Sequence, residues 1–169
     1  MSGAADAGAD GMRRRTFLPF ALPSIDDTDI AGVVEVLRSG WLTTGPRARA
    51  LENAVAVAVG APTAVAVSSG TAAMHVALSA LRPPAGAVVI TTPMTFCSTA
   101  HVVEQVGCRP VFVDVEPDTL NLDPRAVAEA LQDEAGNVVA IIPVHFGGHP
   151  CELDELVELG RRHGVPIVE

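Results

Sequence analysis

The sequence predicts an α/β fold in which helices cover both faces of a mostly parallel sheet, as a three-layer α/β/α arrangement. Three observations lead to this expectation. Short apolar runs without polar alternation are typical of strands that are buried on both faces. Segments with helical periodicity lie between these runs, so strands and helices alternate along the chain. The 169 residues are 49% hydrophobic and 18% charged, a composition that can form a buried core.

Two helices are expected before the first strand. The first has apolar residues at the i, i+3, i+4 and i+7 spacing, and the second has them one turn apart. Each helix is followed by a glycine that can end it. We expect both apolar faces to be buried. The inward residues are Ile30, Val33, Val34 and Leu37 in the first helix and Leu51, Val55 and Val59 in the second, with Gly40 and Gly60 as the ends and Pro46 as the start of the second helix.

The remaining elements alternate from residue 64 to the last residue. The expected strands are Ala64–Val67, Val88–Ile90, Pro110–Val113, Val138–Val144 and Pro166–Val168. The expected helices are Thr71–Leu81, Ser98–Val106, Pro124–Leu131 with Asp123 as N-cap, and Leu153–His163 with Leu153, Leu156, Val157 and Leu159 inward. Because a buried strand is rarely a free terminus, we expect residues 17–169 to be the front part of a longer large domain, preceded by a disordered tail over residues 1–16.

Charge and composition disfavour several classes of partner. The net charge of -9 would repel a phosphate backbone, so we expect no nucleic-acid partner. No apolar run approaches the roughly 18 residues that a membrane helix needs. Three cysteines without CxxC spacing fit a reducing, cytoplasmic location better than a disulfide framework. The arginines at 13–15 resemble the start of an export signal, but the apolar stretch behind them is short and contains prolines.

The sequence contains no lysine. All eleven residues counted as Lys or Arg are arginines. A mechanism that needs a lysine amine, such as a Schiff base or a P-loop lysine, is therefore excluded for this chain acting alone.

Three groups of residues could carry chemistry. Ser69–Ala72 joins an expected strand to an expected helix, and such a junction can bind a phosphate or can simply form a tight turn and a cap. Phe96 follows the second expected strand and on residue type alone favours a core position. His145, His149 and Cys151 are metal-ligand types, but they flank Gly-Gly and Pro in a loop without the i, i+4 spacing of a zinc pair, so we expect no metal.

Several motifs, taken in order, resemble those of the DegT/DnrJ/StrS sugar aminotransferases, which are pyridoxal-phosphate enzymes of fold type I. The resemblance covers residues 17–169, and residues 39–46 are most similar to members that aminate a UDP-4-keto-pentose on the route to aminoarabinose. The motifs are SGWLTTGP (39–46), VSSGTAAMH (67–75), TPMTF (92–96), VDV (113–115), IPVHFGG (142–148) and VPIVE (165–169).

The resemblance implies a cofactor site built from several loops. Gly70, Thr71 and Ala72 match positions that hold the phosphate of pyridoxal 5'-phosphate, and Phe96 matches the aromatic residue that stacks on its ring. A second group matches a loop near the mouth of the active site and would contact substrate. Its residues are Trp41, Thr43 and Thr44. His145 matches a loop that approaches the site, without an assigned role.

The implied reaction transfers an amino group from a donor such as glutamate to a keto-sugar nucleotide, in a family homodimer. The family's aspartate for the pyridine nitrogen and its Schiff-base lysine would follow Glu169, so we expect this chain to be inactive by itself. Two alternatives stay open on the sequence. One is a keto-sugar dehydratase of the same family, and the other is a non-catalytic remnant that binds a family partner.

Overall fold

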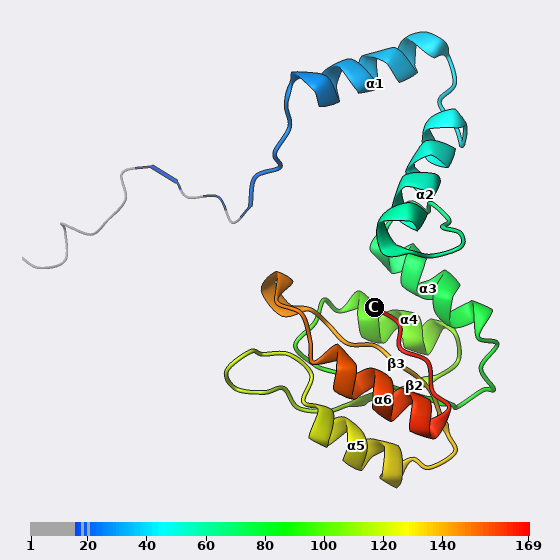
Figure 1. Cartoon of the computed structure of the whole chain (residues 1–169), viewed down its shortest axis with the longest axis vertical. Coiled ribbons are helices and arrows are strands. Elements are labelled where there is room, and N and C mark those ends of the chain that lie inside the picture. The colour runs from blue at the N-terminus through cyan, green and yellow to red at the C-terminus, as the bar shows by residue number, and fades with distance from the viewer. Residues whose placement is uncertain (1–15, 18, 20) are drawn as a thin grey trace, which may run out of the picture. The chain divides into compact units, whose positions relative to one another are not determined.

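The computed structural model describes residues 16, 17, 19 and 21–169 (Figure 1). The chain divides into two units, one up to Leu51 and one from Glu52 onward, which are considered separately. The tail expected over residues 1–16 lies outside the described residues, apart from Thr16. Within the described part of the chain, none of the helices combines the length and the apolar character that crossing a membrane requires.

Two helices begin in the first unit at the expected places. Helix α1 spans Asp27–Ser39, and Asp26 caps it by accepting hydrogen bonds from the backbone N–H groups of Thr28 and Asp29. The carboxylate of Asp29 accepts a bond from the N–H of Asp26 in return, which completes a capping box. Gly40 ends α1 with a φ of 73°, and α2 spans Pro46–Val59.

The expected burial of these two helices is wrong. Ile30, Val33 and Leu37 of α1 are all more than half exposed, and Val34 is only half-buried. In α2, Leu51, Val55 and Val59 are also exposed, and Ala56 is its buried residue. Periodicity identifies an apolar face of a helix, but it does not show that another element covers that face.

The second unit contains a parallel sheet, as the uninterrupted apolar runs predicted. Its strands are β1 (Val88–Thr91), β2 (Arg109–Phe112) and β3 (Val138–Ile141), in the order β2-β1-β3. Val88 of β1 lies opposite Arg109 of β2 and Val138 of β3. All four residues of the central strand β1 are buried, which fits a strand with helices on both faces.

Helices cover both faces of this sheet (Figure 1). Val88 and Ile90 of β1 point into a core that includes Val127 and Leu156, whereas Val89 points to the opposite face. This alternation is the two-residue period of a strand, and it confirms the three-layer α/β/α arrangement. The helices are α3 (Gly70–Ala80) and α4 (Ser98–Gln105) on one face and α5 (Pro124–Asp133) and α6 (Leu153–His163) on the other.

Three of the five expected strands are absent or shorter in the structure. Residues 64–67 form no strand, and Val65 is 74% exposed, because no described segment pairs with them. Residues 166–168 make a single parallel bridge through Ile167 to Ile141, with the N–H of Val168 donating to the carbonyl of Ile141 at 2.9 Å. Strand β3 ends at Ile141, before the expected end.

Helix α6 packs closely against the segment that follows it. A Cβ on Gly160 would lie 2.5 Å from the carbonyl oxygen of Val165 and 3.2 Å from Cδ1 of Ile167. Leu156 is fully buried in the same helix, but Val157 is 53% exposed, so its expected inward position is wrong. Adjacent helical residues point about 100° apart, and here Leu156 faces the core whereas Val157 points toward solvent.

Candidate functional site

The N-terminus of α3 carries the residues expected to bind phosphate. Ser69 caps the helix, because its Oγ accepts a hydrogen bond of 3.1 Å from the N–H of Ala72. The N–H groups of Gly70 and Thr71 have no hydrogen-bond partner among the described residues. A Cβ on Gly70 would meet no atom within 4 Å, so the space beside this backbone is open. Two free N–H groups at a helix N-terminus suit an anion, whereas the N–H of Ala72 is already used.

Phe96 lies in the loop between β1 and α4 and is 76% exposed. The alternative that Phe96 belongs to the core is therefore wrong for this structure. The hydroxyls of Thr95 and Thr99 share a hydrogen bond of 2.8 Å, and Thr99 also contacts the sulfur of Met74 at 4.0 Å. Because Met74 lies one turn beyond Thr71 in α3, these contacts link the Phe96 loop to the first turns of that helix.

The expected substrate residues Trp41, Thr43 and Thr44 lie in the first unit, in the turn between α1 and α2. The indole Nε1 of Trp41 donates a hydrogen bond of 3.0 Å to the carbonyl of Thr44, which folds the ring over the turn. A cavity of about 320 Å³ lies beside it. Its lining includes Trp41, Thr43, Glu35 and Arg47, and the last two form an exposed ion pair. The turn therefore combines an aromatic face with polar and charged groups.

Replacing Gly45 with alanine is expected to displace the ring of Trp41. A Cβ at Gly45 would lie 2.3 Å from Nε1 of Trp41, so the side chain must move and lose its bond to Thr44. Trp41 is the only tryptophan in the sequence, so its fluorescence reports this movement directly. We expect an emission shift to longer wavelength. Gly32→Ala is the matched control, because a Cβ there meets nothing within 4 Å, and an unchanged spectrum in Gly45→Ala would contradict the described turn.

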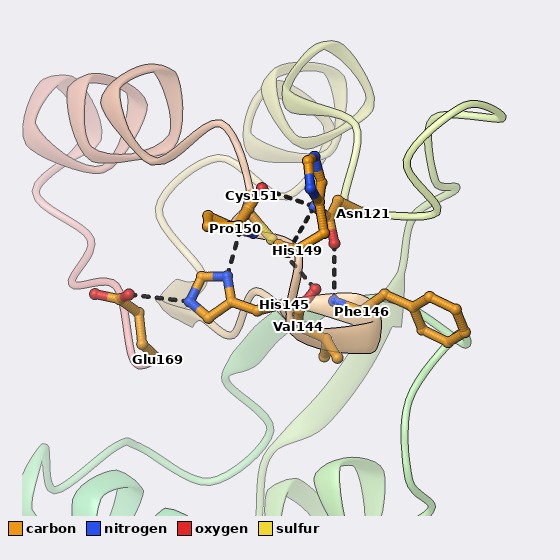
Figure 2. A network of polar contacts seen from close by, with 8 residues as sticks. All are labelled: Asn121, Val144, His145, Phe146, His149, Pro150, Cys151 and Glu169. Atoms are coloured by element: carbon orange, nitrogen blue, oxygen red, sulfur yellow. Dashed lines mark hydrogen bonds and ion pairs between the residues drawn. The ribbon is translucent and has the colours of Figure 1, made fainter.

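A network of polar contacts at the carboxyl end of β3 was not predicted from the sequence (Figure 2). Asn121 is buried, and its side-chain amide donates to the carbonyls of His149 at 3.0 Å and Pro150 at 2.8 Å. Its Oδ1 accepts a bond of 2.9 Å from the N–H of Phe146. One buried side chain thus holds both ends of the 146–150 loop. The only feature of the sequence that could have pointed to this role of Asn121 is its position as a polar residue between two apolar residues.

His145 and Cys151 belong to the same network and are hydrogen-bonded to each other. The N–H of Cys151 donates to Nδ1 of His145 at 3.1 Å, and the Cys151 thiol donates to the carbonyl of Val144 at 3.2 Å. Nε2 of His145 lies 3.1 Å from the carboxylate of Glu169 (Figure 2). Within the described ranges, no group of three or more His, Cys, Asp or Glu residues could hold a metal ion.

The three cysteines should differ strongly in reactivity toward an alkylating reagent. Burial raises the pKa of the Cys108 and Cys151 thiols, and the carboxylates of Glu169 and Glu152 add to the effect at Cys151. Cys97 is exposed, so we expect iodoacetamide to label Cys97 first near neutral pH, because a buried thiol with a raised pKa forms little thiolate. Peptide mass mapping over time measures the order. Equal labelling of all three cysteines is expected only in denaturant, and equal rates in the native chain would contradict this burial.

The architecture and the site together define a class of protein. A parallel sheet between two helical layers, with loops at the carboxyl ends of its strands and an open helix N-terminus, is the arrangement in which α/β proteins bind phosphorylated ligands. It is also the architecture of the fold type I pyridoxal-phosphate transferases. The solved structures that resemble this chain identify the class more closely.

Three solved structures illustrate the similarity. Spr1654 from Streptococcus pneumoniae, assigned as a sugar aminotransferase and solved in its PLP form, is 33% identical, with a TM-score of 0.79 over 88% of this chain and 38% of that one. S. venezuelae DesV, solved with a ketimine intermediate, is 36% identical, with a TM-score of 0.77 over 83% and 37%. An aminotransferase from Psychrobacter cryohalolentis is 35% identical, with a TM-score of 0.80 over 88% and 38%. This chain therefore spans well under half the length of each.

The family profile of the DegT/DnrJ/EryC1/StrS aminotransferases matches residues 23–169. This match covers nearly the whole sequence, and the chain belongs to that family. The family expected from the sequence motifs is thereby confirmed.

Proposed function

We propose that this chain provides the phosphate-binding part of the pyridoxal-phosphate site of an aminotransferase in amino-sugar biosynthesis. The observation that carries the proposal is the open N-terminus of α3, where Gly70 and Thr71 present two N–H groups without a partner among the described residues. Family membership supports the cofactor, since Spr1654 was solved in both PLP and PMP forms. The proposed substrates are a keto-sugar nucleotide and an amino donor such as glutamate.

The residues present fit the phosphate end of the cofactor. Gly70 leaves the backbone open to close approach, and the hydroxyl of exposed Thr71 can add one bond to a phosphate oxygen. The helix dipole of α3 favours a dianion at the same place. Phe96 offers an exposed ring whose face can stack on a flat heteroaromatic ring. Trp41, Thr43 and Thr44 would contact the sugar nucleotide.

Pyridoxal phosphate, when bound, supplies an electron sink for reactions at an amino-bearing carbon. In that chemistry, the proposed role of this chain is to bind the cofactor and to orient it. Gly70 and Thr71 fix the phosphate, and Phe96 fixes the plane of the ring. The sequence has no lysine, so no side-chain amine of this chain can attach the cofactor covalently. We therefore propose that the chain alone does not turn over substrate.

Equilibrium dialysis of the 169-residue chain against pyridoxamine 5'-phosphate tests the proposal. This probe has no aldehyde and cannot form adducts with the amino terminus. We expect it to bind at least about tenfold more tightly than pyridoxamine, since hydrogen bonds to a charged group contribute about 1.5–3 kcal/mol. Equal affinity for the two compounds, or no binding of either, would contradict the proposed phosphate site.

The Phe96→Ala variant tests the stacking role separately. Losing an aromatic pair costs about 0.5–1.5 kcal/mol beyond area burial, so affinity for pyridoxamine 5'-phosphate should fall about two- to tenfold. Phe112→Ala is the matched control, because Phe112 is also an exposed phenylalanine but lies on the edge strand β2. If both variants keep the affinity of the unsubstituted chain, Phe96 is not the platform for the ring.

A further inference from the structure

We propose that His145 is a positioning residue that is held as a neutral imidazole with its proton on Nε2. In this state it connects the loop after β3 to Glu169, and so fixes the segment 166–169 beside the sheet. The proposal rests on two contacts, one at each ring nitrogen, and both are drawn in Figure 2. It concerns only residues of this chain and does not depend on the proposed cofactor.

The backbone determines which nitrogen carries the proton. A peptide N–H can only donate, so the bond of 3.1 Å from Cys151 makes Nδ1 of His145 an acceptor. A neutral imidazole whose Nδ1 accepts must carry its hydrogen on Nε2. That hydrogen points to the Oε2 of Glu169 at 3.1 Å, where a carboxylate accepts it. A proton added to Nδ1 would face the N–H of Cys151 and remove the first bond.

The surroundings of His145 hold the ring in this position. Asn121 fixes both ends of the 146–150 loop through three hydrogen bonds, so the chain on the C-terminal side of His145 has little freedom. The thiol of Cys151 bonds back to the carbonyl of Val144, which closes the loop just before His145. The side chain of His145 is one-third exposed, so it lies between this anchored loop and the more exposed Glu169.

The backbone holds residues 166–168 against β3 with few hydrogen bonds, and the bond from His145 to Glu169 adds to them. Residues 166–168 join β3 through one bridge at Ile167, with hydrogen bonds from Ile141 to Pro166 and from Val168 to Ile141. No longer ladder holds this segment within the described residues. The side-chain bond from His145 to Glu169 therefore lies immediately beyond the last backbone bond, and it restrains the end of the segment.

Nitrogen NMR of the unsubstituted 169-residue chain tests the tautomer directly. At about pH 8, above the ordinary histidine pKa of about 6.5, an isolated imidazole is neutral and exchanges between tautomers. We expect Nδ1 of His145 to show the shift of an unprotonated ring nitrogen and Nε2 that of a protonated one, as a single species. An Nδ1-protonated ring, or the averaged shifts of an exchanging mixture, would overturn the proposal.

Two variants separate the two contacts. His145→Gln keeps a donor near the Nε2 position and removes the acceptor at Nδ1, whereas His145→Asn keeps an acceptor near Nδ1 and cannot reach Glu169. Amide exchange of Cys151 should accelerate about three- to tenfold in His145→Gln only, as for one neutral hydrogen bond. Exchange of Val168 should accelerate similarly in His145→Asn only.

The outcomes distinguish this role from a merely structural one. Equal acceleration of Cys151 and Val168 in both variants would show general loosening and would overturn the proposal, as would no change at either amide. If a variant does not fold, the tautomer measured in the unsubstituted chain still tests the proposal. None of these readouts involves the cofactor, so a failure here leaves the phosphate-site proposal unaffected, and the dialysis result leaves this one unaffected.

Discussion

The amides of Val65, Ala66 and Val67 are expected to exchange with solvent at least about a thousandfold faster than those of Val89 and Ile90. The first three residues belong to no strand, and their only described backbone donor bond runs from Ala66 to the carboxylate of Glu52 at 3.0 Å, at an exposed position. Val89 and Ile90 lie in the central strand, fully buried between two neighbours. Hydrogen exchange followed by NMR or mass spectrometry measures this ratio.

The comparison is internal to one molecule, so protein concentration and pH affect both groups of amides alike. Strand β2 provides an intermediate reference, because it is an edge strand with partly exposed residues. Strong and equal protection at residues 65–67 would mean that another segment or a second chain pairs with them. That result would contradict the exposed backbone of this region, and would favour the strand predicted from its apolar run.

Gly160→Ala is expected to destabilise the second unit by roughly 1–3 kcal/mol, the usual cost of overpacking a close contact. The added methyl would lie 2.5 Å from the carbonyl oxygen of Val165, which is backbone and cannot rotate away. The N–H of Val165 also donates to the carbonyl of Gly160 at 2.8 Å, so the two backbones are tied together at this point. Denaturant unfolding monitored by circular dichroism gives the change in free energy.

Gly32→Ala is the matched control for this substitution. Gly32 is also a helical glycine with an ordinary φ, but a Cβ there would meet no atom within 4 Å. Alanine favours a helix interior over glycine by up to about 1 kcal/mol, so the control should be neutral or slightly stabilising. If Gly160→Ala behaves like Gly32→Ala, helix α6 does not approach residues 165–167 as described.

Local signals allowed much of the fold to be predicted from the sequence. Helix α6 spans Leu153–His163 as expected, and Asp123 caps α5 by accepting the N–H of Arg125 at 2.8 Å. Both features depend on residues adjacent in the chain, so the sequence pattern contains the necessary information. The phosphate-binding role of Gly70 and Thr71 stays a prediction, supported by the open N-terminus of α3.

Other features depend on residues far apart in the sequence. The side chain of Asn121 forms hydrogen bonds with residues 146–150, and His145 contacts Glu169, which follows it in the sequence only after helix α6. No local spacing in the sequence could therefore identify these two contacts. Residues 64–67 have the composition of a buried strand, but strand formation needs a partner, and composition does not provide one. The apolar face of α1 was likewise predicted from the sequence pattern, but the pattern did not predict that this face is exposed.

The position of β1 at the centre of the sheet also sets how this chain folds in time. Val88 pairs with residues roughly 20 and 50 positions later in the sequence, so the core cannot close through local contacts alone. During synthesis at about 5–20 residues per second, β1 leaves the ribosome several seconds before β3 exists to pair with it. The apolar side chains of Val88, Val89 and Ile90 are open to wrong partners during that interval. A nascent chain of this topology is expected to depend on chaperones that bind short apolar segments.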